Sequence, residues 1–292
     1  AVATYLTVSA LFFFTGLVPD LAVVRDQATG RRRKVYSFLA QGWEGTDRQW
    51  RHYGSAYLFL AALATPLVIS VHSIVSWDFA VSVVPGWHST IFGPYFVAGA
   101  IHSGLAMVLT ILIPLRRIYR LETYITRDHL ENLAKLIILT GLIMAYSYGT
   151  EFFIAWYSGN IFERATFIYR AVGDYALAFW IMVVANTIAP LLFIARAIRT
   201  SIAWLFGISI LINIGMWVKR YLIIVPTLQT TFIPAEAAGI NPHYFPSLVE
   251  CMITAGAIAA FLLFFTLFSR LFPILSIWET VEDAEDATQE IL

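Results

Sequence analysis

Residues 72–104, HSIVSWDFAVSVVPGWHSTIFGPYFVAGAIHSG, lie between two strongly apolar stretches of the chain. They contain His72, Asp78, His88 and His102, so that three of the six histidines and a carboxylate fall within one short region. An apolar run, a polar turn and a second apolar run predict a helix, a loop and a second helix. Ionisable side chains at such a place need a functional or structural reason.

The composition of the whole chain places these helices in a membrane. Of the 292 residues, 59% are hydrophobic and only 13% are charged, whereas about 25% are charged in a typical soluble domain. Apolar runs of the roughly 20 residues that cross a bilayer recur along the chain. We therefore predict an all-α, polytopic membrane helix bundle over residues 1–278 and an acidic cytoplasmic tail at 279–292. The seven spans are expected at 3–24, 55–76, 91–115, 134–157, 175–195, 201–218 and 247–270.

The distribution of lysine and arginine predicts the orientation of these spans. If the loop 25–54 is cytoplasmic, 15 basic residues lie on that side and 4 on the other, which obeys the positive-inside rule. Residues 77–90 then form an outer loop, and the proline-rich stretch 219–246 forms an outer segment suited to docking. The four basic residues expected on the outer side are Arg164, Arg170, Lys219 and Arg220.

Charge and cysteine content exclude several classes of protein. The net charge is zero, so no overall field favours nucleic acid. Cys251 is the only cysteine, which excludes an intrachain disulfide or a thiolate cluster, and any iron–sulfur centre must lie in a partner. The chain begins at Ala1 inside an apolar run with no cleavage site after it. We expect a true span of a chain whose beginning is missing, not a signal peptide.

Glu151 is the strongest single candidate for a functional residue. Counted from Lys135 at ~1.5 Å per residue, it lies about 24 Å up the fourth span, at a depth comparable with that of His72. A carboxylate inside a bilayer is a functional hypothesis by default because it is costly to place there. The structural alternative is an ion pair with Arg164 or Arg170 at the outer surface.

His72 and Asp20 each have a structural alternative too. His72 lies about one turn from the outer end of the second span, where a serine or the backbone could satisfy it. Glu151 at a similar depth and Asp78 one loop turn beyond favour a functional site instead. Asp20, near the end of the first span, could pair with Arg25 or reach water.

This combination of a histidine and carboxylates suits quinol oxidation. The reaction releases two electrons and two protons, so a site needs an acceptor at the ring hydroxyls and a carboxylate that passes protons on. Histidine suits the first task because its charge changes near neutral pH. A haem held by His72 and His102 is not expected, because the two differ in depth by about 10 Å at ~1.5 Å per residue.

Three long stretches of the chain resemble a known family. Residues 72–104, with LENLAKLIILTGLIMAYSYGTEFFIAWYSGN at 130–160 and INIGMWVKRYLIIV at 212–225, are similar to the NrfD-type family of polysulfide reductase membrane subunits. The stretch GLVPDLAVVRD at 16–26 is also similar to it. Within the family, the sequence looks most like the quinol-binding NrfD-like subunit of alternative complex III.

The resemblance implies a haemless bundle of eight to ten helices, of which this chain would be a part, in a bacterial cytoplasmic (inner) membrane. It implies that menaquinol or ubiquinol is oxidised near the periplasmic face. It also implies a respiratory or photosynthetic complex with a periplasmic iron–sulfur subunit, a second NrfD-like membrane subunit and c-type cytochrome subunits. The metal centres would belong to these partners, and we expect no metal, haem or iron–sulfur cluster in this chain.

We accordingly assign candidate roles to individual residues. The catalytic candidates are His72, Asp78 and Glu151, and Tyr95 and Tyr148 join them at the quinone site. A proton path would use Asp20, His102, Glu151 and Asp174. The alternative is a proton-translocating or scaffold NrfD-like subunit without a quinone site of its own. A third class, secondary transport, remains open because the polar interruption YSYGTE suggests a broken helix, although no substrate-binding constellation accompanies it.

Overall fold

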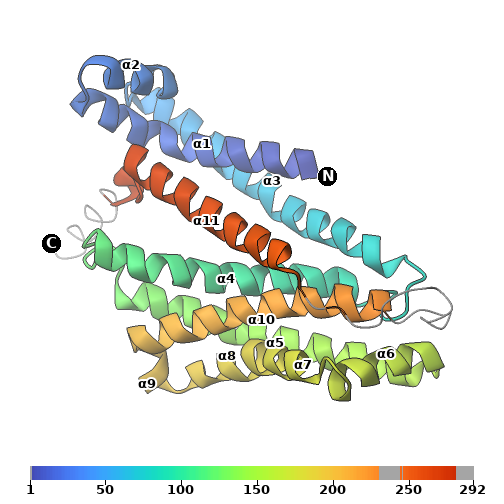
Figure 1. The fold of residues 1–292 in the computed structure, drawn as a ribbon. Helices are drawn as coiled ribbons and strands as arrows, with labels where there is room; N and C mark the ends of the chain where they lie inside the picture. The colour runs from blue at the N-terminus through green and yellow to red at the C-terminus, as the bar shows by residue number, and fades with distance from the viewer. Residues whose placement is uncertain (1, 230–243, 245, 281–292) are drawn as a thin grey trace. The chain divides into compact units, whose positions relative to one another are not determined.

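The computed structural model describes residues 2–229, 244 and 246–280. It is 83% helical, and no strand occurs among the residues described. Residues 230–243 of the predicted docking segment and 281–292 of the predicted acidic tail lie outside this part of the chain. In chain order the helices are α1 (Val2–Gln27), α2 (Gly30–Leu39), α3 (Asp47–Ala80), α4 (Phe92–Ile118), α5 (Arg127–Tyr157), α6 (Ile161–Val172), α7 (Ala176–Val183), α8 (Ala189–Leu191), α9 (Arg196–Arg199), α10 (Ile202–Gln229) and α11 (Leu248–Leu271) (Figure 1).

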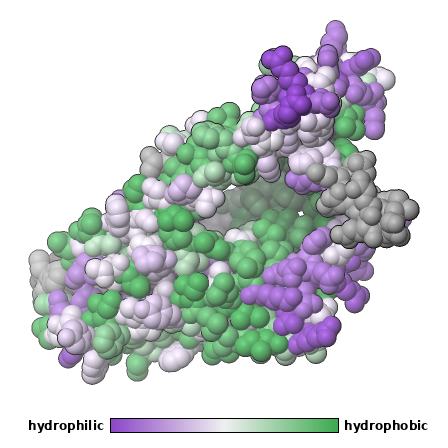
Figure 2. Space-filling view, turned by 180° about the vertical axis from the view of Figure 1, so that it is seen from behind, coloured by the Kyte–Doolittle hydropathy of each residue, from purple (hydrophilic) through white to green (hydrophobic). Residues whose placement is uncertain are grey.

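Seven of these segments are long and apolar enough to cross a membrane, which confirms the predicted polytopic helix bundle. They are α1, α3, α4, α5, the broken helix Ala176–Ile194, α10 and α11. Figure 2 shows hydrophobic side chains covering the sides of the helices, with hydrophilic ones gathered toward helix ends and loops. Hydrocarbon can cover the former and water the latter, as a bilayer requires.

The fifth span, Ala176–Ile194, is broken for an identifiable reason. It passes from α7 through a π-helical turn at Val184–Ile188 and α8 to a 3-10 turn at Leu192–Ile194. Pro190 lies at the start of α8 and has no N–H to donate to the carbonyl four residues earlier, that of Asn186. Wider π turns commonly accompany such interruptions. The turn brings the Asn186 side chain into the core, where it is 0% exposed.

Two helices differ from the sequence-based expectation. The sixth span was expected to end at 218, but α10 continues to Gln229, because the apolar run YLIIV resumes after Lys219 and Arg220. Lys219 therefore lies inside a helix and is buried, not in an outer loop. Between the fourth and fifth spans, the region expected to be a loop forms α6, whose residues Glu163, Thr166, Phe167 and Arg170 face inward.

The described chain divides into two compact units. Unit 2, residues 69–244, contains the last turns of α3 and the helices α4 to α10. In this unit α4 packs against both α10 and α5, and α7 and the π turn pack against α10. Fully buried side chains such as Tyr95, Leu109, Ile137 and Ile212 form its core.

Unit 1, residues 1–68 and 245–292, contains α1, α2, the first part of α3 and α11. Its small core contains Leu21, Ala22, Tyr36 and Ala40. The Tyr36 hydroxyl donates to the Leu271 carbonyl at 2.6 Å. The buried carboxylate of Asp20 accepts from the backbone N–H groups of Ile277 at 3.0 Å and Trp278 at 3.3 Å. Residues near the two ends of the chain thus fasten this unit together.

Candidate functional site

A buried ion pair joins α5 and α6 in unit 2. Arg170 Nη1, from α6, lies 3.3 Å from Glu151 Oε1, from α5, and their side chains are only 5% and 7% exposed. Helix periodicity directs the Glu151 carboxylate inward. Because α5 continues unbroken to Tyr157, Glu151 lies on the same buried face of the helix as Ser147 and Tyr148. Separating or exposing two opposite charges at such a site would be costly.

A second cation lies beside this pair. Lys219, from α10, is 4% exposed, and its Nζ lies 3.4 Å from the centre of the Tyr95 ring. A cation above the negative face of an aromatic ring is stabilised without a full counter-charge. Tyr148 meets Tyr95 edge-on, with ring centres 5.7 Å apart. Two cations, one carboxylate and two tyrosines therefore share one interior.

A small cavity joins these side chains, and we call it the inner cavity. Its volume is about 20 Å³, and its polar lining comes from Tyr95, Tyr148, Glu151, Arg170 and Lys219. That volume exceeds the ~10–15 Å³ that one water molecule needs. It is far below the ~300–1,000 Å³ of pockets that hold organic ligands. The inner cavity can hold or pass a proton through water but has no room for a quinone ring.

Two further polar side chains are buried in the same bundle. His102 Nδ1 lies 2.8 Å from Thr140 Oγ1, and the Thr140 hydroxyl donates to the backbone of its own helix. Thr140 therefore accepts from His102, which leaves Nε2 as the acceptor nitrogen of a neutral ring; no group in the described residues donates to it. Asn186 donates to the Tyr148 hydroxyl at 3.1 Å.

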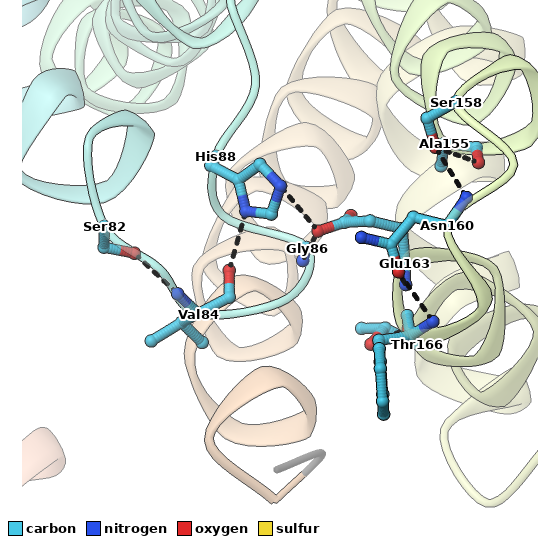
Figure 3. Close-up of polar contacts among 10 residues, drawn as sticks. Ser82, Val84, Gly86, His88, Ala155, Ser158, Asn160, Glu163 and Thr166 are labelled. Atoms are coloured by element: carbon cyan, nitrogen blue, oxygen red, sulfur yellow. Dashed lines mark hydrogen bonds and ion pairs between the residues drawn. The ribbon is translucent and has the colours of Figure 1, made fainter. Parts of the chain in front are cut away.

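A second cavity, which we call the loop pocket, lies between loop 81–91 and the helices α5 and α6. It has a volume of about 120 Å³ and is lined by Gly86, His88, Ser89, Glu151, Ile154, Ala155, Ser158, Asn160, Glu163 and Phe167. Figure 3 shows His88 pointing from the loop toward Glu163 of α6. His88 Nε2 lies 3.2 Å from Glu163 Oε1, which also accepts from the Gly86 backbone N–H at 2.9 Å.

Gly86 lets the loop lie this close to α6. Its φ of +84° is in the left-handed region that glycine tolerates best. A Cβ there would stand 3.0 Å from both Arg170 Nη2 and Thr166 Cγ2. The same loop is fixed to α10 by Trp87, whose indole N–H donates to the Ile223 carbonyl at 2.6 Å. The loop is thus held against α6 and α10, the helices that carry Arg170 and Lys219.

The structure brings together some of the predicted site residues and separates others. Tyr95, Tyr148 and Glu151 all line the inner cavity. His72 is half-buried and Asp78 exposed on the last turns of α3, and neither contributes to the lining of the inner cavity or the loop pocket.

The predicted proton-path residues other than Glu151 are spread over the chain. His102 is bound to Thr140 within unit 2. Asp174 accepts from the Tyr169 hydroxyl at 2.9 Å beside the end of α6. Asp20 lies in unit 1, and its two described hydrogen bonds are with backbone N–H groups, not with Arg25. Arg25 contacts Asp26 instead, at 2.8 Å.

Sequence reasoning did not assign roles to Glu163 and Lys219, and it considered Arg170 only as a surface partner of Glu151. Glu163, Thr166, Phe167 and Arg170 are spaced i, i+3, i+4, i+7, which is the signature of one helix face. That spacing could have predicted α6. Lys219 could have been recognised by the apolar run that continues on both sides of it.

The comparison with known proteins agrees with this architecture. Residues 5–232 match the family described as polysulphide reductase, NrfD. The chain belongs to the NrfD family. The match begins inside α1 and continues through all the helices up to the end of α10. All the residues that line the inner cavity and the loop pocket therefore lie within the matched region.

Two curated relatives of this NrfD-family chain are named as membrane subunits of oxidoreductases. It is 26% identical over 256 residues to a putative dimethyl sulfoxide reductase membrane subunit of Halobacterium salinarum, covering 81% of this chain and 57% of that protein. It is 24% identical over 256 residues to the Hdr-like menaquinol oxidoreductase integral membrane subunit of Archaeoglobus fulgidus, covering 80% and 63%. The chain therefore spans about 60% of the length of these relatives.

Proposed function

We propose that this NrfD-family chain is a membrane subunit of a quinol-oxidising complex and that Glu151 accepts the protons released from quinol. The name of the Archaeoglobus relative refers to menaquinol, which favours a quinol as the substrate. Electrons would leave through a periplasmic iron–sulfur subunit toward c-type cytochromes, in an assembly with a second NrfD-like subunit. The resemblance to alternative complex III supports this choice of partners.

The observation that carries the proposal is the burial of Glu151 with Arg170 and Lys219. Their side chains lie almost wholly inside the bundle, where moving charges out of water costs several kcal/mol per ion. A hydrophobic core of the same volume would hold α5, α6 and α10 together at least as well. A carboxylate that shares a cavity with two cations can instead take up a proton and release it again, because the cations favour the return to the charged form.

The quinol ring itself needs more room than the inner cavity offers. The last turns of α3 carry His72 and Asp78, a histidine that can accept from a ring hydroxyl and a carboxylate that can take its proton. We therefore assign quinol contact to His72 and Asp78. Tyr95 and Tyr148, which line the inner cavity with Glu151, then serve the proton's route and not the ring.

Steady-state quinol oxidation by the assembled complex tests this proposal. Glu151→Gln, which cannot take up a proton, should lower kcat by about 100-fold or more with quinol KM little changed, since loss of a general base typically costs 10²–10⁴-fold. His72→Ala should chiefly raise KM. Glu131→Gln is the matched control on the same helix, because Glu131 pairs with Arg199 at 2.9 Å far along α5 from Glu151. Wild-type kcat and KM in both Glu151→Gln and His72→Ala would disprove the assignment.

A proton-translocating subunit without a quinone site is the second candidate function. The small volumes of the inner cavity and the loop pocket favour it, as do polar side chains along the bundle. Asn213 donates to Thr110 at 2.9 Å, and Thr110 to Ser209 at 3.0 Å. A photoreactive quinone analogue distinguishes the two: labelling near His72 supports quinol binding by this chain, and labelling of other subunits alone supports the second candidate.

A further inference from the structure

Glu151 lies at the junction of two cavities. It lines the inner cavity with Arg170 and Lys219, and it lines the loop pocket with His88 and Glu163. The loop pocket, at about 120 Å³, is several times larger than the ~10–15 Å³ that one water needs, and six of its ten lining residues have polar side chains. A water-filled connection can therefore reach Glu151 from the side of loop 81–91.

Two buried groups and one exposed group lie along this connection. The side chain of Glu151 is 7% exposed, that of Glu163 is 9% exposed, and that of His88 is 43% exposed. Asn160 holds Glu163 in place from the N-terminus of α6, because its side-chain oxygen accepts from the N–H groups of Phe162 at 2.9 Å and Glu163 at 3.5 Å. The three titratable groups thus form a series from the interior to the surface.

His88 faces two oxygen atoms, one at each ring nitrogen. Its Nδ1 lies 3.4 Å from the Val84 carbonyl oxygen (Figure 3), and its Nε2 lies 3.2 Å from Glu163 Oε1. A ring nitrogen donates when it carries a hydrogen and accepts when it does not, so Nε2 can pass a proton to the carboxylate or take one from it. The pair therefore joins a buried carboxylate to a partly exposed imidazole within hydrogen-bond distance.

We propose that the loop pocket is the aqueous route by which Glu151 exchanges protons with the membrane surface, and that His88 and Glu163 carry the proton within it. A proton leaving the Glu151 carboxyl passes through water to the Glu163 carboxylate. Glu163 passes a proton to Nε2 of the neutral His88 ring, and the resulting imidazolium releases one proton to solvent, which restores the carboxylate and the neutral ring. Only O–H and N–H bonds form and break, and no electron moves. The groups around Glu151 in this step are Arg170, Lys219, Glu163, Tyr95 and Tyr148.

The route rests on the proposed function only for the source of its protons, so its first test does not use quinol. Cys251→Ser removes the only cysteine, and Glu151→Cys is then introduced into the full-length protein in sealed vesicles. The membrane-impermeant reagent methanethiosulfonate ethyltrimethylammonium is added to each side separately. We expect modification from the side of loop 81–91 alone, at least about tenfold faster after His88→Ala. Modification from the opposite side alone, or none, would overturn the route.

Ala155→Cys keeps this test decisive if Glu151→Cys does not assemble. Ala155 lies one helical turn from Glu151 on α5, is 5% exposed and lines the same pocket. It should show the same sidedness and the same acceleration by His88→Ala.

A second test asks whether His88 carries protons or merely fastens the loop. In the assembled complex, His88→Gly should lower kcat for quinol oxidation at least about tenfold with KM unchanged, and added imidazole should restore it because the site is open to solvent. Trp87→Phe is the structural control, since it loosens the same loop from α10 without entering the pocket, and imidazole should not affect it. Absence of imidazole rescue in His88→Gly would refute proton transfer by His88. If Glu151→Gln and His72→Ala both turn over normally, the quinol assignment has failed, whereas the access test still decides the route.

Discussion

Burying either Glu151 or Arg170 without the other would cost several kcal/mol of folding free energy, and their mutual attraction offsets part of that cost. Arg170→Met leaves the Glu151 carboxylate without its closest cation, and loss of one partner from a buried pair typically costs about 3–5 kcal/mol. We expect Arg170→Met to lower the Tm of the purified full-length protein substantially. The double variant Arg170→Met/Glu151→Gln should recover much of the loss, because it leaves no unpaired carboxylate.

Arg164→Met is the matched control for this prediction. Arg164 lies on α6 as Arg170 does, but it is only partly buried and donates to the Trp156 carbonyl at 2.6 Å and not to a carboxylate. Its loss should lower Tm only slightly. If the double variant is as unstable as the sum of its two single variants, the two charges do not stabilise each other and the ion pair is not the reason for their burial.

At the level of single residues, the sequence singles out Glu151 but not the cations that the structure places beside it. An acidic residue within an apolar helix is visible without a structure because the bilayer makes it costly. Arg170 and Lys219 were expected on the outer side, because Arg170 lies between the expected fourth and fifth spans and Lys219 directly follows the expected end of the sixth. Only the burial of α6 and the continuation of α10 bring them inside. A cation paired across helices cannot be recognised from local composition.

At the level of helices, the packing of α10 against the π turn is the tightest contact of the candidate site. Gly215 of α10 faces Ala185 and Asn186, and an added Cβ would lie 2.5 Å from Ala185 Cβ and 2.8 Å from Asn186 Oδ1. Gly215→Ala should therefore separate the helices and cost about 1–3 kcal/mol of stability. It should lower the Tm of the full-length protein and, through the shift of Asn186 and Tyr148, quinol turnover.

Gly207 provides the matched control on the same helix. No atom lies within 4 Å of a Cβ placed there, and alanine is favoured over glycine in a helix by up to ~1 kcal/mol. Gly207→Ala should leave Tm unchanged or raise it. An equal Tm for Gly215→Ala and Gly207→Ala would show that α10 does not approach the π turn as closely as described.

The membrane spans can be predicted from the sequence. The interruption of the fifth span and the short helix α6 are harder to predict. Long apolar runs determine all seven spans, and the structure confirms them. Pro190 signals an interruption of the fifth span but not its π geometry, which depends on packing against α5 and α10. The helix α6 was missed because reading for long apolar runs passes over a 12-residue amphipathic helix, although its inward face supplies Glu163 and Phe167 to the lining of the loop pocket and Arg170 to the ion pair.

At the level of the whole molecule, each unit is fastened by polar groups far apart in the sequence. In unit 1, Asp20 accepts from the backbone at residues 277 and 278, and Tyr36 donates to residue 271. In unit 2, Gly86 and Trp87 bind Glu163 and the carbonyl of Ile223. Such contacts cannot be read from hydropathy. The partners of Asp20 also give this buried carboxylate a structural role that does not require a proton path.

The orientation of the chain in the membrane is a prediction for the whole molecule. The burial of two basic side chains strengthens it. Of the four basic residues expected on the outer side, Arg170 and Lys219 are 5% and 4% exposed and so do not face that side. Only Arg164 and Arg220 remain there, against 15 on the other side. The positive-inside rule then predicts more strongly that loop 81–91 faces the periplasm and loop 119–126 the cytoplasm.

Two cysteine variants in the Cys251→Ser background test this orientation. Thr90 lies in loop 81–91 and Thr123 in loop 119–126, and both are exposed. In intact cells, an impermeant maleimide should label Thr90→Cys directly but Thr123→Cys only after the membrane is permeabilised. Since both changes replace threonine by a side chain of similar size, differences in reactivity should reflect the membrane and not folding. Direct labelling of Thr123→Cys with protection of Thr90→Cys would reverse the topology, and the loop pocket would then open to the cytoplasm.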